Sequence, residues 1–447
     1  MKKSIFAILK EKLQGVGETK KHLFAVYSLQ IVFVLLGFLI NLLIARFFGK
    51  EVFGEYSYFF SLGIILSTFA SLGIYKFIST HKFSESVKLY LQSVPVLIAS
   101  SLVFGFLGAF VPQWLNLNPR ISYFVIIVVA YVVFRTLFLS KISPLRAAHK
   151  FVQSNVISLF SRVFFLLFIV LGWLYDLKIL LFVGLPISFL LLLLYPIPFY
   201  RKQETKGLDS GLGSNSGLFS SLSFGLNEGI FSVLIFSSFV FLLQDLSFLL
   251  LFHIDRLSIE YILGSVVLGE FNAISTFTNV IRISSGIFPL VLIPLAASKR
   301  YKIRKSLFSL LLFLVPFCAV VLFATPILLP LFFGSAFQAP FSLTLALVVS
   351  SLLLVVYSFL SSLFLGRKCE KKFVRKVLLW DFALSFIGNI GLNIWFIMAF
   401  GVIGAPIATA VVLILKSGLI LWAFEHSKRN NLLASDIQAK EVEAVES

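Results

Sequence analysis

Long apolar runs alternate with short polar segments along almost the whole chain. Most of these runs hold about 20 apolar residues or more, the length that an α-helix needs to cross the hydrocarbon core of a bilayer. Polar and apolar residues do not alternate within the runs, so the pattern favours helices over the strands of a membrane β-barrel. We therefore predict an all-α, polytopic membrane protein with about twelve transmembrane helices. The predicted spans are residues 24–48, 56–75, 90–111, 121–140, 154–175, 177–199, 237–262, 270–297, 306–333, 341–365, 377–400 and 402–425.

Polar segments divide these helices into two groups. The first apolar run is too long for a signal-peptide core and has no small-residue cleavage site, so we interpret it as an uncleaved helix. A Gly- and Ser-rich segment from Arg201 to Ser216 then separates two sets of six helices. The expected domains are a basic N-terminus (1–23), a six-helix bundle (24–199), a linker (200–224), a second six-helix bundle (225–425) and a C-terminal tail (426–447).

The distribution of Lys and Arg sets the orientation of the predicted helices. Charged residues make up 13% of the chain and hydrophobic residues 59%, whereas a soluble domain is about 25% charged. Of the 38 Lys and Arg residues, 29 fall in segments that are cytoplasmic if the N-terminus is cytoplasmic, and three fall in outer turns. The positive-inside rule thus predicts a protein of the cytoplasmic (inner) membrane with both termini in the cytoplasm. The net charge of +18 is dispersed between apolar runs, so we expect no nucleic-acid partner.

One short motif occurs at two equivalent places. Residues 49–56 read GKEVFGEY and residues 264–271, 215 positions later, read GSVVLGEF. Each copy lies at the predicted outer turn between the first two helices of its group, which favours a duplication over coincidence. Six helices is an even number, so we expect two parallel six-helix repeats around a central cavity. The repeat pairs Gly49 with Gly264 and Gly54 with Gly269.

Several stretches resemble one transporter family. Residues 41–57, NLLIARFFGKEVFGEYS, look like the first-helix signature of the polysaccharide and lipid-linked oligosaccharide flippases. Further similar stretches are residues 254–256 leading to Gly264, Pro294-Leu295, residues 389–393 and residues 400–409, so that the resemblance covers residues 24–425. The motif positions are Asn41, Gly49, Gly54, Gly264, Gly269, Asn393 and Gly404.

That family shares the multidrug/oligosaccharidyl-lipid/polysaccharide (MOP) exporter superfamily with the multidrug and toxic-compound extruders (MATE). The resemblance implies a MATE-like fold and a flippase of the O-antigen or capsule type. Its cargo would be an oligosaccharide on polyprenyl pyrophosphate, crossing by alternating access. Membrane lipids, glycosyltransferases and a glycan polymerase would be its partners.

Charged residues inside the predicted helices are candidates for a transport site, because a charge within the bilayer costs a few kcal/mol and is usually functional. The repeat extends the seventh helix to about Ile262, past its hydropathy end near His253, which places Asp255 and Arg256 inside the membrane. Arg282 lies near the middle of the eighth helix. Guanidinium groups bind phosphate oxygens in pairs, so a basic lumen suits a pyrophosphate. The candidate substrate-binding residues are Arg282, Arg46, Arg256 and Asp255.

Simpler interpretations stay open for several cations. Arg135, Arg162 and Lys416 lie within reach of the inner interface, where a long side chain extends its charge to water. Arg46 has the same option at the outer interface, and Arg256 has the option of pairing with Asp255 or the first helix.

The sequence lacks motifs for bond-making chemistry. Cys318 and Cys369 are the only cysteines, and neither a P-loop nor an H-E-x-x-H motif is present. We therefore expect no metal, no cofactor, no catalytic residue and no enzymatic activity. The alternatives are efflux of a small molecule, which a basic lumen makes less favourable for cationic drugs, a membrane glycan polymerase or ligase, and a scaffold that transports nothing.

Overall fold

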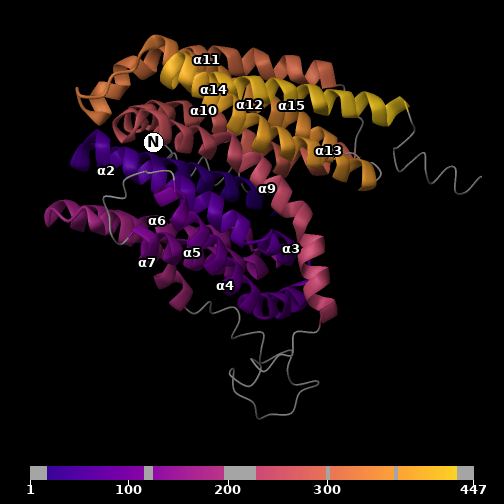
Figure 1. The fold of residues 1–447 in the computed structure, drawn as a ribbon. Helices are drawn as coiled ribbons and strands as arrows, with labels where there is room; N and C mark the ends of the chain where they lie inside the picture. The colour runs from indigo at the N-terminus through magenta and orange to yellow at the C-terminus, as the bar shows by residue number, and fades with distance from the viewer. Residues whose placement is uncertain are drawn as a thin grey trace, which may run out of the picture.

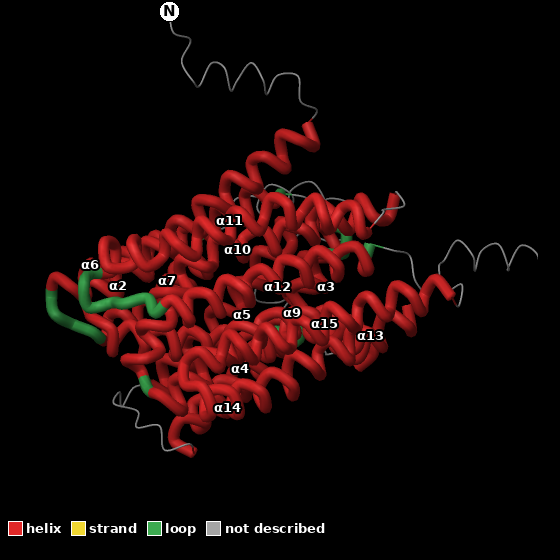
Figure 2. The backbone as a smooth tube through the Cα atoms, turned by 90° about the horizontal axis from the view of Figure 1, so that it is seen from above, coloured by secondary structure: helices red, strands yellow, loops and turns green. Residues whose placement is uncertain are grey.

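The chain folds entirely into helices where its structure is described. The computed structural model describes residues 18–114, 124–148, 150–195, 228–298, 303–366 and 371–429. In these ranges every regular element is a helix and no strand occurs (Figure 2), which confirms the predicted all-α fold. The elements are α2 (Glu18–Ala70), α3 (Ile74–Ser79), α4 (Phe83–Trp114), α5 (Phe124–Ala147), α6 (Phe151–Leu174), α7 (Ile179–Leu194), α9 (Glu228–Leu263), α10 (Ser265–Ser298), α11 (Ile303–Phe333), α12 (Phe341–Leu365), α13 (Lys371–Ala383), η2 (Leu384–Gly388), α14 (Asn389–Phe400), η3 (Gly401–Ile403) and α15 (Gly404–Arg429).

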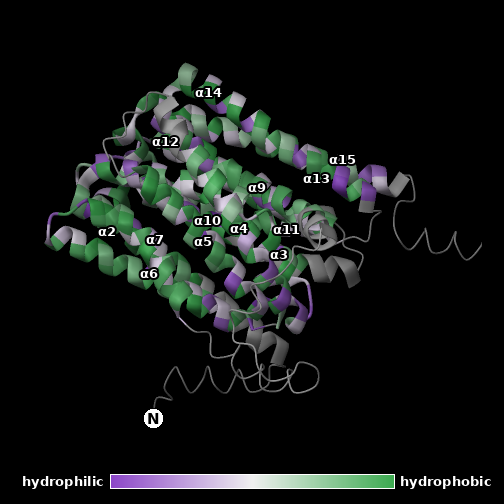
Figure 3. Cartoon of the chain, turned by 60° about the horizontal axis from the view of Figure 1, so that its bottom comes forward, coloured by the Kyte–Doolittle hydropathy of each residue, from purple (hydrophilic) through white to green (hydrophobic). Residues whose placement is uncertain are grey.

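The helices have the length and composition of membrane spans. Eight stretches of the described residues are long and apolar enough to cross a bilayer, and apolar residues cover most of the helices in Figure 3. Two of them exceed a single crossing: Ile31–Ala70 has 40 residues and Lys372–Ser427 has 56. The backbone is non-helical at Gly49 within the first, and φ is positive at Gly401 within the second. The protein is therefore a polytopic helical membrane protein, whereas the number twelve stays a prediction.

The earlier helices (α2 to α7) and the later helices (α9 to α15) meet along α2 and α10. Figure 1 shows α4 to α7 on one side of this contact and α11 to α15 on the other, with α9 running along the edge. The largest cluster of buried apolar side chains joins both sides, with Phe53 and Phe59 from α2 packed together with Ile274 from α10. The predicted domain boundaries stay predictions. Residues 1–17, the linker over 200–224 and residues 430–447 lie outside the described residues.

The two outer turns are tighter than the sequence suggested. Helix α9 ends at Leu263, which confirms the helix end that the repeat predicted. The predicted polar turns of several residues are wrong, because helical structure resumes at Lys50 in α2 and at Ser265 in α10. A single glycine makes each turn, with φ of 81° at Gly49 and 85° at Gly264, a conformation that side chains with a Cβ rarely adopt. Both turns share this positive φ at the corresponding glycine, in agreement with a duplication.

The second glycine of each motif allows the two copies to touch. A Cβ on Gly54 would lie 1.8 Å from the Ser265 carbonyl oxygen, and a Cβ on Gly269 would lie 2.1 Å from the Lys50 carbonyl oxygen. Each glycine thus faces the residue that follows the turn glycine of the other copy. This reciprocity agrees with two repeats related by a local two-fold axis.

Helix geometry changes between α13 and α14. The chain passes from α13 into α14 through the π-helical turn η2, which contains the buried Ser385. A π-turn widens the helix by one residue and is often found at functional sites. The following turn is close-packed, since a Cβ on Gly404 would lie 2.1 Å from the Phe396 carbonyl oxygen.

Candidate transport site

A buried carboxylate lies where α9, α14 and α15 meet. Asp255 on α9 is 3% exposed, and Thr409 on α15 donates to its carboxylate at 2.8 Å. The Asn393 amide, from α14, donates to the same carboxylate at 3.0 Å. Asn389 supports this amide with its side-chain oxygen and donates in turn to the Leu250 carbonyl of α9. The motif residue Asn393 is therefore part of the site, and Asp255 is held by neutral donors.

The two arginines predicted beside Asp255 are near it. Arg256 and Arg282 both interact electrostatically with the Asp255 carboxylate and with each other. The Arg282 Nε donates to the Ser351 hydroxyl on α12 at 2.9 Å, and its guanidinium lies 4.6 Å from the centre of the Phe252 ring. In the described part of the chain, Arg256 makes no hydrogen bond or ion pair within contact distance. Two positive charges therefore surround one negative charge.

The other predicted positions lie apart from this cluster. Arg46 is exposed on α2 and makes no hydrogen bond or ion pair with another described residue, so the structure does not bring it into the site. Asn41 donates to the Thr276 hydroxyl on α10 at 3.0 Å, which fixes α2 against α10. In the repeat, Asn41 corresponds to Arg256, so one copy uses this position for a contact between helices and the other for a free cation.

Two cations of the earlier helices interact with the same residues as Arg256, although the sequence did not assign them to the site. Arg162 on α6 donates to the Phe33 carbonyl of α2, and its guanidinium lies 4.3 Å from the centre of the Phe33 ring. Arg162 and Arg256 also act electrostatically on the Tyr56 hydroxyl. Arg135 on α5 donates to the Ser67 hydroxyl of α2 and, like Arg256, acts on the His253 ring. Their depth in the helices was the signal, because a snorkelling side chain does not reach toward the opposite helices.

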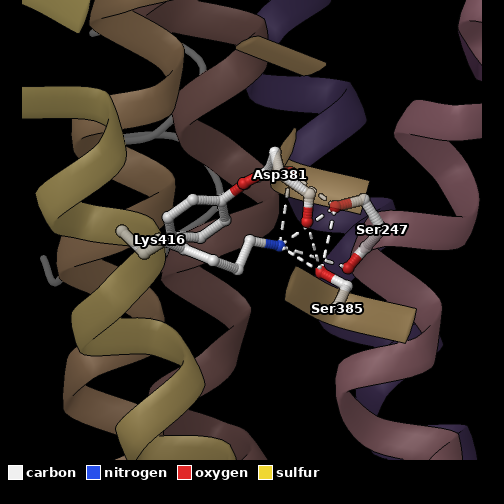
Figure 4. A network of polar contacts seen from close by, with 5 residues as sticks. Ser247, Asp381, Ser385 and Lys416 are labelled. Atoms are coloured by element: carbon white, nitrogen blue, oxygen red, sulfur yellow. Dashed lines mark hydrogen bonds and ion pairs between the residues drawn. The ribbon is translucent and has the colours of Figure 1, made fainter. Parts of the chain in front are cut away.

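Lys416 is the clearest departure from the sequence interpretation. It was expected to extend to the inner interface, but it is fully buried and forms an ion pair with Asp381 of α13, with 3.3 Å between Nζ and Oδ2. Figure 4 shows Lys416 also donating to the hydroxyls of Ser247 and Ser385, at 3.0 and 2.6 Å. Tyr357 donates to the Asp381 carboxylate at 2.8 Å. This network connects α9, α12, α13, η2 and α15, and its charges cancel.

The described residues hold no group of three or more His, Cys, Asp or Glu side chains that could bind a metal ion. What the arrangement offers is a set of guanidinium groups from α5, α6, α9 and α10, accompanied by one buried acid. Such a set can bind an anion by charge and by paired hydrogen bonds.

The chain resembles known proteins both in a family pattern of its sequence and in its fold. The family model described as "Polysaccharide biosynthesis protein" matches residues 20–299. No curated protein matches the chain in sequence.

Three solved structures illustrate the likeness in fold. The lipid II flippase MurJ in an inward closed conformation has a TM-score of 0.63 at 17% identity, over 90% of this chain and 87% of that one. The MATE multidrug transporter DinF-BH has a TM-score of 0.57 at 15% identity, over 91% and 96%. An inward-facing multidrug resistance MATE family transporter of the MOP superfamily has 0.54 at 14%, over 91% and 98%. The predicted MATE-like fold is therefore confirmed. Because the family model covers more than half of its residues, the chain belongs to the polysaccharide biosynthesis protein family.

Proposed function

We propose that this protein flips a lipid-linked oligosaccharide, carried on polyprenyl pyrophosphate, across the cytoplasmic membrane by alternating access. The observation that carries the proposal is the excess of arginine among the intramembrane charges of the described residues. Arg256 and Arg282 share one nearby acid, Asp255. Arg162 interacts with Tyr56 and Arg135 with His253, and Arg256 acts on both of these residues. A pyrophosphate is the part of such a cargo that this charge would attract.

The chemistry of the arginine side chains fits a phosphate group better than a single carboxylate. A guanidinium presents several donors in a fixed plane and binds two phosphate oxygens together, and it stays charged even when it is partly buried. Asp255 is satisfied by Thr409 and Asn393, so it does not need to pair with Arg256. Arg256 thus keeps its donors for cargo. The glycan would pass through a hydrated central cavity while the lipid tail stays in the bilayer.

The family and the fold support the same class of cargo. The chain belongs to a family described by polysaccharide biosynthesis, and one structure that shares its fold is a lipid II flippase. In this role the protein would receive its cargo from membrane glycosyltransferases and deliver it to a glycan polymerase at the outer face, and it would make no covalent bond itself.

The test is complementation of a strain that lacks its own flippase, with surface polysaccharide measured per molecule of folded protein. Arg282→Ala should lower surface polysaccharide about tenfold or more at unchanged abundance, because a charge-assisted contact to the cargo is lost. Arg282→Lys should restore it only partly, because a point charge replaces a planar fork. Arg46→Ala is the matched control and should have a small effect, since Arg46 is exposed. Wild-type surface polysaccharide in Arg282→Ala would contradict the proposal.

Efflux of a small molecule is the second candidate, because two of the structures that share the fold are multidrug transporters. The excess of arginine disfavours cationic drugs, for which an acidic site is expected. Cells that express the protein should therefore retain a cationic dye as long as cells that do not. Faster loss of the dye would favour efflux over flipping.

A further inference from the structure

A second charged cluster closes the inner end of the contact between α3 and α9. We call it the inner seam, formed by Gly73, Tyr75 and Lys76 on the α3 side and by Ser238 and Asp245 on α9. The Tyr75 hydroxyl donates to the Asp245 carboxylate at 2.5 Å, and Lys76 forms an ion pair with the same carboxylate. A Cβ on Gly73 would lie 2.3 Å from the Ser238 carbonyl oxygen, so the backbones touch.

The inner seam lies far from the outer turns. Asp245 precedes the turn glycine Gly264 by 19 residues, which is about 28 Å along a helix. The Lys76 segment is one of those that the charge distribution predicts to be cytoplasmic. Cargo made in the cytoplasm would meet the protein at this end.

Positive charge exceeds negative charge at the inner seam. Besides Lys76, Arg146 of α5 acts electrostatically on both Tyr75 and Asp245, and Arg135 acts on Tyr75. Burial, followed by the nearby Asp245, raises the pKa of the Tyr75 phenol well above its ordinary value, so Tyr75 remains a donor at physiological pH. The Asp245 carboxylate therefore accepts from one phenol and interacts with two cations, Lys76 and Arg146.

The cations of the inner seam continue into the transport site. Arg135 acts on Tyr75 at the seam and on His253 at the centre, and Arg256 acts on His253 as well. Arg135 therefore interacts with a residue of each cluster, and among the described residues it has no ion-pair partner. A cation thus lies between the inner seam and the transport site.

We propose that Tyr75, Lys76 and Arg146 form an entry site for a diphosphate group, and that the Asp245 carboxylate occupies this site as an internal substitute until cargo displaces it. The proposal rests on the proposed function, because it takes the diphosphate of the lipid carrier as the ligand. A diphosphate carries more charge than a carboxylate and offers more acceptor oxygens, so it competes for the same donors.

Displacement of Asp245 would couple cargo binding to opening of the inner seam. The diphosphate can bind Tyr75 and Lys76 only when Asp245 has left them, so it binds the open seam better than the closed one. A ligand with this preference shifts the population toward the open state. Empty protein would thereby stay closed at its inner end.

The experiment measures seam opening and ligand binding on the purified full chain in nanodiscs. Spin labels at the exposed positions Thr80 and Phe239, in a Cys318→Ser/Cys369→Ser background, report the distance between α3 and α9. The probes are geranylgeranyl diphosphate, geranylgeraniol, which lacks the diphosphate, and inorganic pyrophosphate. Geranylgeranyl diphosphate should lengthen the distance, and geranylgeraniol should not. A response to inorganic pyrophosphate would assign the recognition to the headgroup alone.

Variants at Asp245 and at Lys76 should have the same effect on the distance and opposite effects on binding. Asp245→Asn removes the internal competitor, so it should open the seam and bind geranylgeranyl diphosphate about fivefold tighter, because the competent state is more populated. Asp245→Ala should open it further. Lys76→Gln should also open the seam but bind the probe about tenfold more weakly, since a cation of the site is lost. A merely structural ion pair would not give opposite changes in affinity.

Glu270→Gln is the matched control at the outer end, where Glu270 forms an ion pair with Lys50. It should change neither the inner distance nor the affinity. The inference is overturned if Asp245→Asn leaves the seam closed or weakens binding. If no variant binds the diphosphate although Asp245→Asn opens the seam, the entry site is wrong and Asp245 only holds the seam closed. Complementation by Arg282→Ala tests the proposed function separately.

Discussion

Arg135 and Arg162 of the earlier helices differ from Lys416 of the later helices in the groups to which they donate. The two arginines donate to neutral acceptors, the Ser67 hydroxyl and the Phe33 carbonyl, and among the described residues neither has an acid within ion-pair distance. Lys416 instead meets Asp381 within a network of hydroxyl groups, where it is fully buried. Positive charge is therefore kept at Arg135 and Arg162 and cancelled at Lys416.

The difference separates two uses of a buried charge. A neutralised, hydrogen-bonded pair exerts little field beyond its surroundings and fixes the packing of the helices that contribute to it. A cation held by neutral groups keeps its field and remains available to a ligand. We therefore expect stability to depend mainly on the network of the later helices, and transport mainly on the arginines.

The largest loss of stability should follow from breaking the Lys416 pair. Lys416→Ala leaves the Asp381 carboxylate buried without its cation, and this should lower the free energy of unfolding by about 3–5 kcal/mol. Lys416→Met combined with Asp381→Asn removes both charges and should recover most of this loss. Thermal unfolding of the purified protein measures both. If the double variant were as unstable as Lys416→Ala, the pair would stabilise the protein by more than mutual neutralisation.

An intermediate loss should follow at Asp255. Asp255→Ala deprives Thr409 and Asn393 of a shared acceptor in a buried site, which should lower the free energy of unfolding by about 1–3 kcal/mol. Glu85→Ala is the control because Glu85 is exposed on α4, and it should leave stability nearly unchanged. Equal unfolding temperatures for both variants would show that Asp255 does not hold α14 and α15 to α9.

The smallest change in stability should come from Arg135. Arg135→Gln keeps a donor for the Ser67 hydroxyl and breaks no ion pair, so its free energy of unfolding should stay within about 1 kcal/mol of the wild-type value. Surface polysaccharide in the complementation assay should nevertheless fall severalfold, because a cation between the inner seam and the transport site is lost. A large loss of stability with normal transport would reverse the comparison.

The sequence predicted the fold better than the site because hydropathy averages over whole helices. Apolar runs and the repeated glycine motif predicted the helices, and the repeat predicted the end of α9 at Leu263, where hydropathy alone would have stopped near His253. We expected a break between two helices at Gly49, but we did not expect a turn made by a single residue. Polar residues such as Lys50 and Glu51 were interpreted as a loop although they continue the helix.

The sequence predicted those residues of the site whose role follows from their depth in the membrane. Arg282 is too deep to reach water, and Arg256 and Asp255 are adjacent, so their proximity followed from the chain. The ion pair of Lys416 with Asp381 joins residues 35 positions apart, and sequence spacing does not show that two helices bring them together. Sequence spacing likewise did not show the contact of Arg162 with Phe33, which is 129 positions away, although the depth of Arg162 in α6 was a signal.

The π-turn η2 determines what a deletion of one residue in this helix would do. Its hydrogen bonds span one residue more than those of an α-helix, so the faces of α13 and α14 are offset by about 100° relative to an uninterrupted helix. Loss of one residue within Leu384–Gly388 would convert the turn to α-helix and rotate Asp381 away from Lys416 while Asn393 kept its place. Related chains that lack this residue should therefore also lack the buried pair, and a gap-free alignment across this helix would match the wrong side chains.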